Sequence, residues 1–221
     1  MLNQALAEMR ADPARFLRHY LVLIAGGTPG IVPQQQATFS MKVGDRLFRG
    51  FQTGLSGTVG LMKQRPQLRI TKVPDGTTAG ADEVVFQAWY IPMTEMNAGG
   101  GGLAHHVTLS GNGGPDIALT SQMSGCTLGI GSALGDGSRF VAHIRPPSGP
   151  PNIQTYADMR NDASLGTMDG FFERPSRPGT QSYGNPHNRA TIIGVRHAGQ
   201  WHFYAQTYNF DARKLFKVEQ L

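Results

Sequence analysis

The sequence predicts an α+β fold whose core is a mixed or antiparallel β-sandwich, flanked by helices and long loops. Short runs of β-branched and aromatic residues recur along the 221 residues and are separated by turn-forming residues. Glycine (29 residues) and proline (14 residues) are frequent, which argues against a bundle of long helices. Since β-rich domains of about 200–250 residues commonly fold as one unit, residues 1–221 are expected to form a single domain.

The first 36 residues are predicted to form a helical cap that packs on the sandwich. Apolar residues recur at helical spacing over residues 2–9. Asp12-Pro13 then offers an N-cap residue followed by proline at the first helical position. We expect this second helix to run from residue 13 towards residue 25 and to stop at Gly26-Gly27.

The strands are predicted from residue 37 onward. Residues 83–91 form the strongest candidate of the first half, and Pro92 ends it because proline cannot donate to a ladder. A turn at Gly44-Asp45 is expected to separate two earlier strands. The chain closes with a hairpin that turns at residues 197–200, and its last strand alternates in the manner of a half-buried strand. The predicted strands are residues 38–43, 47–51, 67–73, 83–91, 107–109, 116–119, 127–130, 139–144, 190–196 and 201–208.

Charge and apolar patterning limit the classes of partner. The formal net charge is +5, but the twenty lysines and arginines are spread thinly, with no run longer than Arg213-Lys214. We therefore expect no direct contact with nucleic acid, and a solvated basic surface that suits an acidic protein partner. No apolar stretch reaches the length of a membrane span, and the first residues lack the pattern of a signal peptide. The expectation is a monomer that is made in the cytoplasm without a cleavable signal.

The single cysteine, Cys126, excludes some kinds of site. One cysteine cannot form a disulfide within the chain or a zinc site with several cysteines. The adjacent pair His105-His106 would point to opposite faces of a strand and is a poor chelate without further ligands. Neither a metal nor an organic cofactor is expected.

Cys126 and His143 are the candidate catalytic pair. The histidine follows the cysteine by seventeen residues (143 − 126 = 17), across a turn at Gly135-Asp136-Gly137. If the flanking segments pair as antiparallel strands, this turn brings the two side chains together. An imidazole beside a thiol can take its proton and produce the attacking thiolate, so we expect Cys126 to be an activated nucleophile. The backbone N–H groups of Ser124, Gly125 and Cys126 are candidates for an oxyanion site.

Other interpretations of these residues stay open. A lone cysteine is often a buried apolar side chain, in which case the chain is a non-enzymatic β-rich interaction module. A thiol protease, amidase or transglutaminase would use the same acyl intermediate with another bond or acceptor.

The residues around Cys126 resemble a known toxin family. Met123-Ser124-Gly125-Cys126, followed by Gly135-Asp136-Gly137 and the strand that carries His143, resembles the Burkholderia lethal factor and the catalytic domain of cytotoxic necrotizing factor. Thr120 stands six residues before the cysteine, as the active-site threonine of the family does. The resemblance extends through Trp89-Tyr90-Ile91-Pro92 and the closing hairpin, whereas residues 1–80 match poorly. The interval from cysteine to histidine is longer here than in the lethal factor.

The resemblance implies a function. These toxins deamidate a glutamine of a host protein to glutamate, so it implies a single deamidase-like domain with Cys126 as nucleophile, His143 as base and Thr120 as the residue that orients the histidine. It also implies a bacterial protein that is secreted or delivered into the host cytosol. The substrate would be a translation-initiation helicase or a Rho-type GTPase. Selectivity is expected from loops at residues 99–106, 145–151 and 174–187, because a cysteine–histidine pair cannot itself distinguish one glutamine from another.

Overall fold

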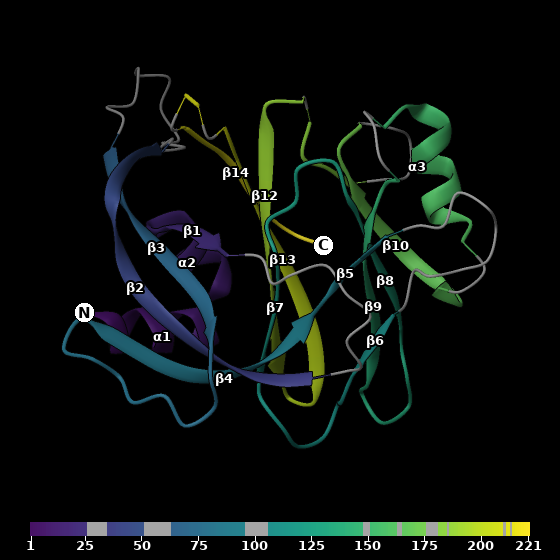
Figure 1. Cartoon of the computed structure of the whole chain (residues 1–221). Helices are drawn as coiled ribbons and strands as arrows, with labels where there is room; N and C mark the ends of the chain where they lie inside the picture. The colour runs from purple at the N-terminus through teal and green to yellow at the C-terminus, as the bar shows by residue number, and fades with distance from the viewer. Residues whose placement is uncertain are drawn as a thin grey trace, which may run out of the picture.

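The computed structural model describes residues 1–25, 35–50, 63–95, 106–147, 151–162, 165–175, 181–184, 186–209, 211–212 and 214–221. Within these residues three helices accompany two mixed β-sheets (Figure 1). The helices are α1 (Leu2–Ala11), α2 (Pro13–His19) and α3 (Ile153–Arg160). The strands are β1 (Leu21–Ile24), β2 (Gln35–Gly50), β3 (Lys63–Val73), β4 (Glu83–Ile91), β5 (Met93–Glu95), β6 (Val107–Leu109), β7 (Ile117–Thr120), β8 (Thr127–Ala133), β9 (Arg139–Arg145), β10 (Met168–Glu173), β11 (Gln181–Ser182), β12 (Asn188–His197), β13 (Gln200–Asn209) and β14 (Lys214–Gln220).

The two sheets have different sizes. The larger sheet has the order β1-β3-β2-β14-β13-β12-β7-β4, and β4 also pairs with the first half of β2. The smaller sheet has the order β11-β10-β8-β9-β5, and β6 pairs with the free part of β9. The chain passes from the larger to the smaller sheet at Pro92, which separates β4 from β5. Mixed sheets with flanking helices confirm the predicted α+β class.

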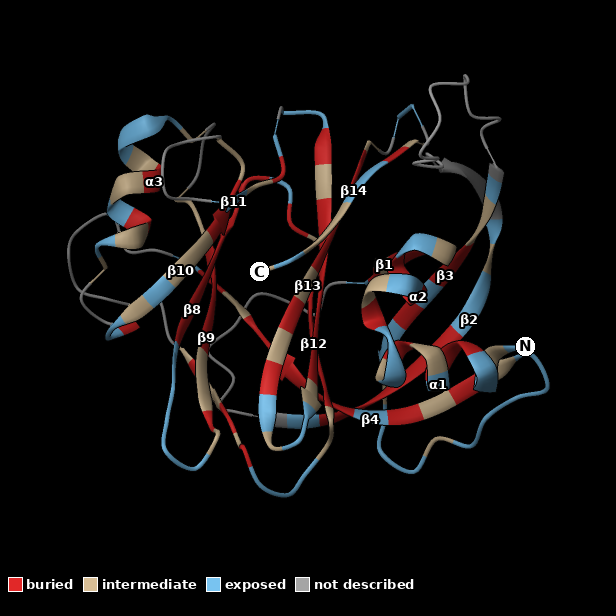
Figure 2. Ribbon diagram, turned by 180° about the vertical axis from the view of Figure 1, so that it is seen from behind, coloured by how far each residue is buried: buried red, intermediate tan, exposed pale blue. Residues whose placement is uncertain are grey.

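Three apolar clusters define the layers. One lies between α1, α2 and the outer face of the larger sheet, and includes Phe16, Phe39 and Ile193. The second joins the facing sides of the two sheets, and the third lies between the smaller sheet and α3. Figure 2 shows the result, with mostly buried strands β8 and β9 in the interior and half-exposed helices outside. No helix of the described residues is long and apolar enough to cross a membrane.

The N-terminal cap is less helical than the sequence predicts. The N-cap prediction is confirmed, because the Asp12 carboxylate accepts from the backbone N–H of Arg15 at 2.9 Å. The predicted continuation of this helix to residue 25 is wrong: the helix ends at His19, and Leu21–Ile24 is a strand that pairs in parallel with β3. Of the rest of the predicted cap, residues 26–34 lie outside the described residues, and residues 35 and 36 are not part of a cap but begin strand β2.

A buried glutamine explains the change from helix to strand. The Gln206 carboxamide donates to the backbone carbonyls of Leu17 and Tyr20 and accepts from the backbone N–H of Val22 at 2.9 Å. The hydroxyl of Thr191 donates to the carbonyl of Val22 at 2.6 Å. These contacts satisfy the end of α2 and the start of β1, and they come from residues remote in the sequence, so helical spacing alone could not predict them.

Two other strand predictions have different outcomes. The predicted turn at Gly44-Asp45 is wrong, since β2 continues through it and the register with β3 shifts between Val43 and Leu47 as in a bulge. The closing hairpin is confirmed, with all ten residue pairs from Asn188↔Asn209 to His197↔Gln200 in register. Its two-residue turn has positive φ at Ala198 (49°) and Gly199 (77°), which is the geometry of a type I′ turn.

Candidate active site around Cys126

Cys126 ends a short connection between the two sheets. Met123 bridges to Ala190 of β12 through two backbone hydrogen bonds, of 2.8 and 3.0 Å. Ser124 and Gly125 follow, and Cys126 immediately precedes β8 in the smaller sheet. The nearest atoms to the missing Cβ of Gly125 belong to the side chains of Arg174 and Pro151, at 3.8 Å, so a methyl group would also fit there.

Three side chains hold the carbonyl groups of this connection. Arg174 Nη1 donates to the Ser124 carbonyl at 3.3 Å, Tyr156 Oη to that of Gly125 at 3.2 Å, and Tyr183 Oη to that of Cys126 at 2.9 Å. In a trans peptide the carbonyl points away from the N–H of the next residue. The N–H groups of Gly125 and Cys126 are therefore turned away from Arg174 and Tyr156.

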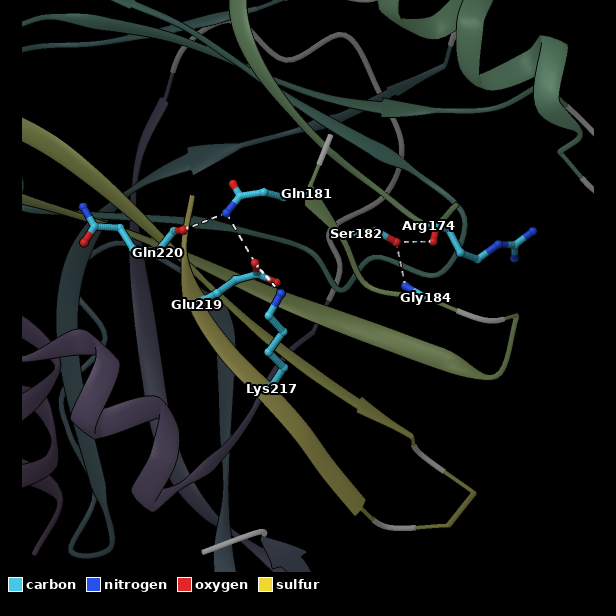
Figure 3. A network of polar contacts seen from close by, with 7 residues as sticks. All are labelled: Arg174, Gln181, Ser182, Gly184, Lys217, Glu219 and Gln220. Carbon is cyan, nitrogen blue, oxygen red and sulfur yellow. Dashed lines mark hydrogen bonds and ion pairs between the residues drawn. The ribbon is translucent and has the colours of Figure 1, made fainter. Parts of the chain in front are cut away.

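The residues that make these contacts are themselves fixed. Gln181 of β11 donates to the Gln220 carbonyl at 2.9 Å and to the Glu219 carboxylate at 3.3 Å, which Lys217 also contacts (Figure 3). Ser182 donates to the Arg174 carbonyl at 2.7 Å and accepts from the N–H of Gly184 at 3.0 Å. The segment that carries Tyr183 is thus joined to the C-terminal strand on one side and to Arg174 on the other.

His143 and Thr120 lie on facing sheets. His143 belongs to β9 and shares a face with Val141, which packs in the cluster between the sheets. Thr120 ends β7 on the face of Ala118, in the same cluster. The Thr120 hydroxyl lies 2.6 Å from His143 Nδ1. The two residues therefore meet across the interior, not along one sheet.

The hydrogen bonds of Thr120 define the tautomer of the histidine. The Thr120 hydroxyl donates its one hydrogen to the carbonyl of Ile91 at 2.8 Å. Towards Nδ1 it can then only accept, so Nδ1 of His143 carries the proton and Nε2 holds a lone pair. Nε2 is buried and has no hydrogen-bond partner among the described residues. A buried acceptor without a partner costs stability, so this nitrogen is the feature of the site that needs an explanation.

Burial keeps both groups neutral in this structure. It lowers the pKa of His143 from 6.5 to about 3. It also raises the pKa of the Cys126 thiol from 9.0 to about 11, although the backbone N–H of Ser124 and the charges of Arg145 and Arg174 act in the opposite direction. Desolvation thus outweighs the neighbouring positive charges in the free protein, and the activated thiol expected from the sequence stays a prediction.

The ladder places Cys126 and His143 as diagonal neighbours. The predicted antiparallel pairing of their strands is confirmed, but the register joins His143 to Leu128, two residues beyond Cys126. No hydrogen bond joins the thiol to the imidazole among the described atoms; the thiol instead lies 3.7 Å from the Met93 sulfur. Met93 pairs with His143 in the neighbouring strand β5. Diagonal partners are about 7–8 Å apart at their backbones, a separation that side chains can bridge.

The longer interval between Cys126 and His143 is absorbed by the strands. β8 extends to Ala133, with a register shift between Ile130 and Ala133, so the additional residues do not form a separate loop. The Gly135-Asp136-Gly137 turn lies at the opposite end of β8 from the thiol. Asp136 accepts from the N–H and the hydroxyl of Ser138, both at 2.9 Å, and these bonds lower the pKa of its carboxyl. This part of the motif builds the turn.

A pocket of about 510 Å³ opens onto Cys126. Its volume falls in the range of about 300–1,000 Å³ that ligand sites occupy. The buried hydroxyl of Ser121 lies in its lining and has no hydrogen-bond partner in the described part of the chain. Its lining comes from β1, β3, β5 and the 121–126 connection, and consists of Leu23, Ile24, Ala25, Arg69, Thr71, Met93, Ser121, Gln122, Ser124 and Cys126.

The sequence analysis did not find several residues that line the pocket or contact the 124–126 connection. Arg69, Met93, Tyr156 and Arg174 reach the site from separate elements, and their local patterns carry no signal for it. The predicted selectivity loop at residues 99–106 lies outside the described residues, apart from His106, and the other two loops are described only in part. Among the described residues, no group of three or more His, Cys, Asp or Glu side chains is arranged to hold a metal ion.

Comparisons with known proteins give one kind of match. The chain matches no protein-family model, and no curated protein matches it in sequence. Among solved structures it is similar to the C-terminal domain of CNFy from Yersinia pseudotuberculosis, with 10% sequence identity and a TM-score of 0.42. The alignment covers 99% of this chain and 97% of that one.

Proposed function

We propose that this chain is a cysteine-dependent protein-glutamine deamidase, which converts a glutamine of a host protein to glutamate through a thioester on Cys126. The observation that carries the proposal is the Thr120–His143 hydrogen bond, because it leaves Nε2 of the histidine as a base without a partner among the described residues, on the strand that pairs with β8 directly after Cys126. The motif around Cys126, which resembles the lethal factor and necrotizing factor toxins, supports the same chemistry.

The first half of the reaction forms the thioester. The glutamine side chain enters the pocket and displaces the Met93 sulfur from the thiol. His143 Nε2 takes the thiol proton as the sulfur of Cys126 bonds to the carboxamide carbon. The resulting tetrahedral oxyanion and imidazolium carry opposite charges and stabilise each other, which offsets the burial that keeps the thiol and the imidazole neutral beforehand. The imidazolium then gives its proton to the amide nitrogen, the C–N bond breaks and ammonia leaves.

The second half of the reaction regenerates the cysteine. His143 Nε2 takes a proton from water while the water oxygen bonds to the thioester carbon. The C–S bond breaks, the sulfur recovers the proton from the imidazolium, and glutamate is released. Thr120 acts throughout by keeping the proton of Nδ1 in place, the role that a carboxylate has in serine-type triads.

Backbone N–H groups stabilise the tetrahedral oxyanion in this mechanism. Those of Gly125 and Cys126, together with Ser124 in the same turn, are the donors that we propose. Such a donor contributes about 10²–10³ in rate. The contacts of Arg174, Tyr156 and Tyr183 with the carbonyl oxygens fix these peptide planes before the substrate arrives.

The substrate in this proposal is a folded host protein. By resemblance it is a translation-initiation helicase or a Rho-type GTPase, and the chain acts as a toxin or effector in the host cytosol. Neither a metal nor an organic cofactor enters the steps above. A protease would cleave the substrate chain, and a transglutaminase would join an amine to the same glutamine.

Peptide mapping of host lysate proteins tests the proposal. Wild type should convert specific glutamines to glutamates with release of ammonia, while Cys126→Ser and His143→Gln lower the conversion by at least about 10²-fold. Chain cleavage or amine incorporation would assign the thiol to one of the other reactions. Full conversion by Cys126→Ser would mean that Cys126 is not the nucleophile of a deamidase, a protease or a transglutaminase.

A further inference from the structure

One wall of the pocket comes from the N-terminal part of the chain. β1 and β3 pair in parallel with Leu23 beside Arg69, and Ala25 donates its N–H to the Ile70 carbonyl at 2.9 Å. Ile24 and Ile70 point into the cluster beneath α1 and α2. Because neighbouring residues of a strand point to opposite faces, Leu23, Arg69 and Thr71 share the other face, which lines the pocket.

Arg69 is the one charged residue among the described residues that line the pocket. Its side chain is exposed and makes no hydrogen bond or ion pair with the described part of the chain. The carboxylate of Glu83, which is opposite Lys42 on the other side of β2, contacts the Lys42 ammonium at 3.3 Å and not Arg69. A guanidinium without a partner in a pocket wall is available for a ligand.

The charges that act on the thiol are positive. Arg145 and Arg174 both lower the pKa of Cys126 through their charge. Arg145 lies 3.6 Å from Glu95, and Arg174 donates to the Ser124 carbonyl, so both have partners within the protein. Among the described residues that line the pocket, Arg69 is therefore the cation available to the substrate.

We propose that Arg69 binds the carboxylate of an aspartate or glutamate that neighbours the target glutamine in the substrate protein. A guanidinium fits a carboxylate with two parallel hydrogen bonds, and it rejects a lysine or arginine at the same place by charge repulsion. This inference rests on the proposed deamidase function, and it defines the substrate class as a glutamine within an acidic segment.

Alkylation of Cys126 tests the charge of the pocket without a substrate. Iodoacetate and iodoacetamide form the same C–S bond and expel the same iodide, but only iodoacetate is an anion. Since Cys126 is the only cysteine of the chain, intact mass reports its reaction without ambiguity. The ratio of the two rates cancels the thiolate fraction, so it isolates the effect of charge.

The expected result is a lower ratio when the charge of Arg69 is removed. Arg69→Gln should reduce the iodoacetate-to-iodoacetamide ratio about fivefold, the effect of losing one positive charge in contact with the carboxylate of the bound reagent in a watery site. Lys72→Gln is the matched control, because it removes the same charge from β3 on the opposite face, where the Lys72 ammonium lies 5.6 Å from the Tyr90 ring centre. Equal ratios in wild type and Arg69→Gln would overturn the inference.

Mapping of the deamidated sites separates this inference from the proposed function. Glutamines that wild type converts should have aspartate or glutamate as a neighbour, and Arg69→Gln should convert them more slowly while Lys72→Gln does not. If deamidation occurs without acidic neighbours and without an effect of Arg69→Gln, only the inference about Arg69 is wrong. If no deamidation occurs but the alkylation ratio falls as expected, the anion site stands and the proposed function is wrong.

Discussion

Gln206 and His143 are two polar side chains at the same depth, each 0% exposed, yet the protein treats them differently. Gln206 lies beneath the N-terminal layer, and both ends of its carboxamide are bonded to the backbone at α2 and β1. His143 lies between the sheets with one nitrogen bonded and the other without a partner among the described residues. A fully bonded buried group stabilises a fold, whereas a buried base left free is available for reaction.

Two buried threonines repeat this contrast. Thr191 donates to the Val22 carbonyl and helps to hold β1. Thr120 donates to the Ile91 carbonyl and also accepts from His143, so it joins the backbone to the candidate base. Both are 0% exposed, and the difference between them is that Thr120 contacts His143, the candidate base.

The largest effect should come from breaking the bonded glutamine. Gln206→Leu leaves the N–H of Val22 and the carbonyls of Leu17 and Tyr20 without their partner, so we expect the free energy of unfolding to fall by about 3 kcal/mol. Urea denaturation measures this loss. The rate of glutamine deamidation per folded molecule should stay at the wild-type value. An unchanged unfolding free energy would mean that the hydrogen bonds of Gln206 do not stabilise the fold, and the contrast with His143 would be wrong.

The second effect concerns acid. The pKa of His143 is lowered to about 3 in the folded protein, from 6.5, so between these values the unfolded chain binds one more proton here than the folded chain. The unfolding free energy should therefore fall as the pH falls, by at most about 1.4 kcal/mol per pH unit from this group. Urea denaturation at several pH values in this window measures how the unfolding free energy depends on pH. This dependence should be weaker in His143→Gln than in wild type. An equal dependence would mean that the histidine is not buried as a neutral base.

The smallest effect should come from the threonine pair. Thr191→Val should lower the unfolding free energy by about 1 kcal/mol without a change in turnover. Thr120→Val should instead lower turnover about tenfold, or about 1.4 kcal/mol in activation free energy, because Nδ1 loses its acceptor. Thr120→Ser keeps the hydroxyl and should recover the rate. Similar losses of turnover in both valine variants would mean that Thr120 has no special relation to His143.

Several features follow from local sequence alone. The N-cap at Asp12, the end of β4 before Pro92 and the closing hairpin all depend on residues within a few positions of one another. The pairing of the strands that flank Gly135-Asp136-Gly137 is also local, because a short turn brings its neighbours together. Such patterns reflect backbone preferences and alternation, which adjacent residues determine.

Other features depend on contacts between distant segments. The change from helix to strand after His19 depends on Gln206, which lies 184 residues beyond Val22. The strand β14 and the pocket wall at Arg69 are likewise defined by their neighbours in space. The sequence by itself determined the α+β class, the hairpins and the candidate residues Thr120, Cys126 and His143. Only the tertiary structure decided the tautomer of the histidine, the neutral state of the thiol and the charge of the pocket, because desolvation and hydrogen bonding between the sheets produce them.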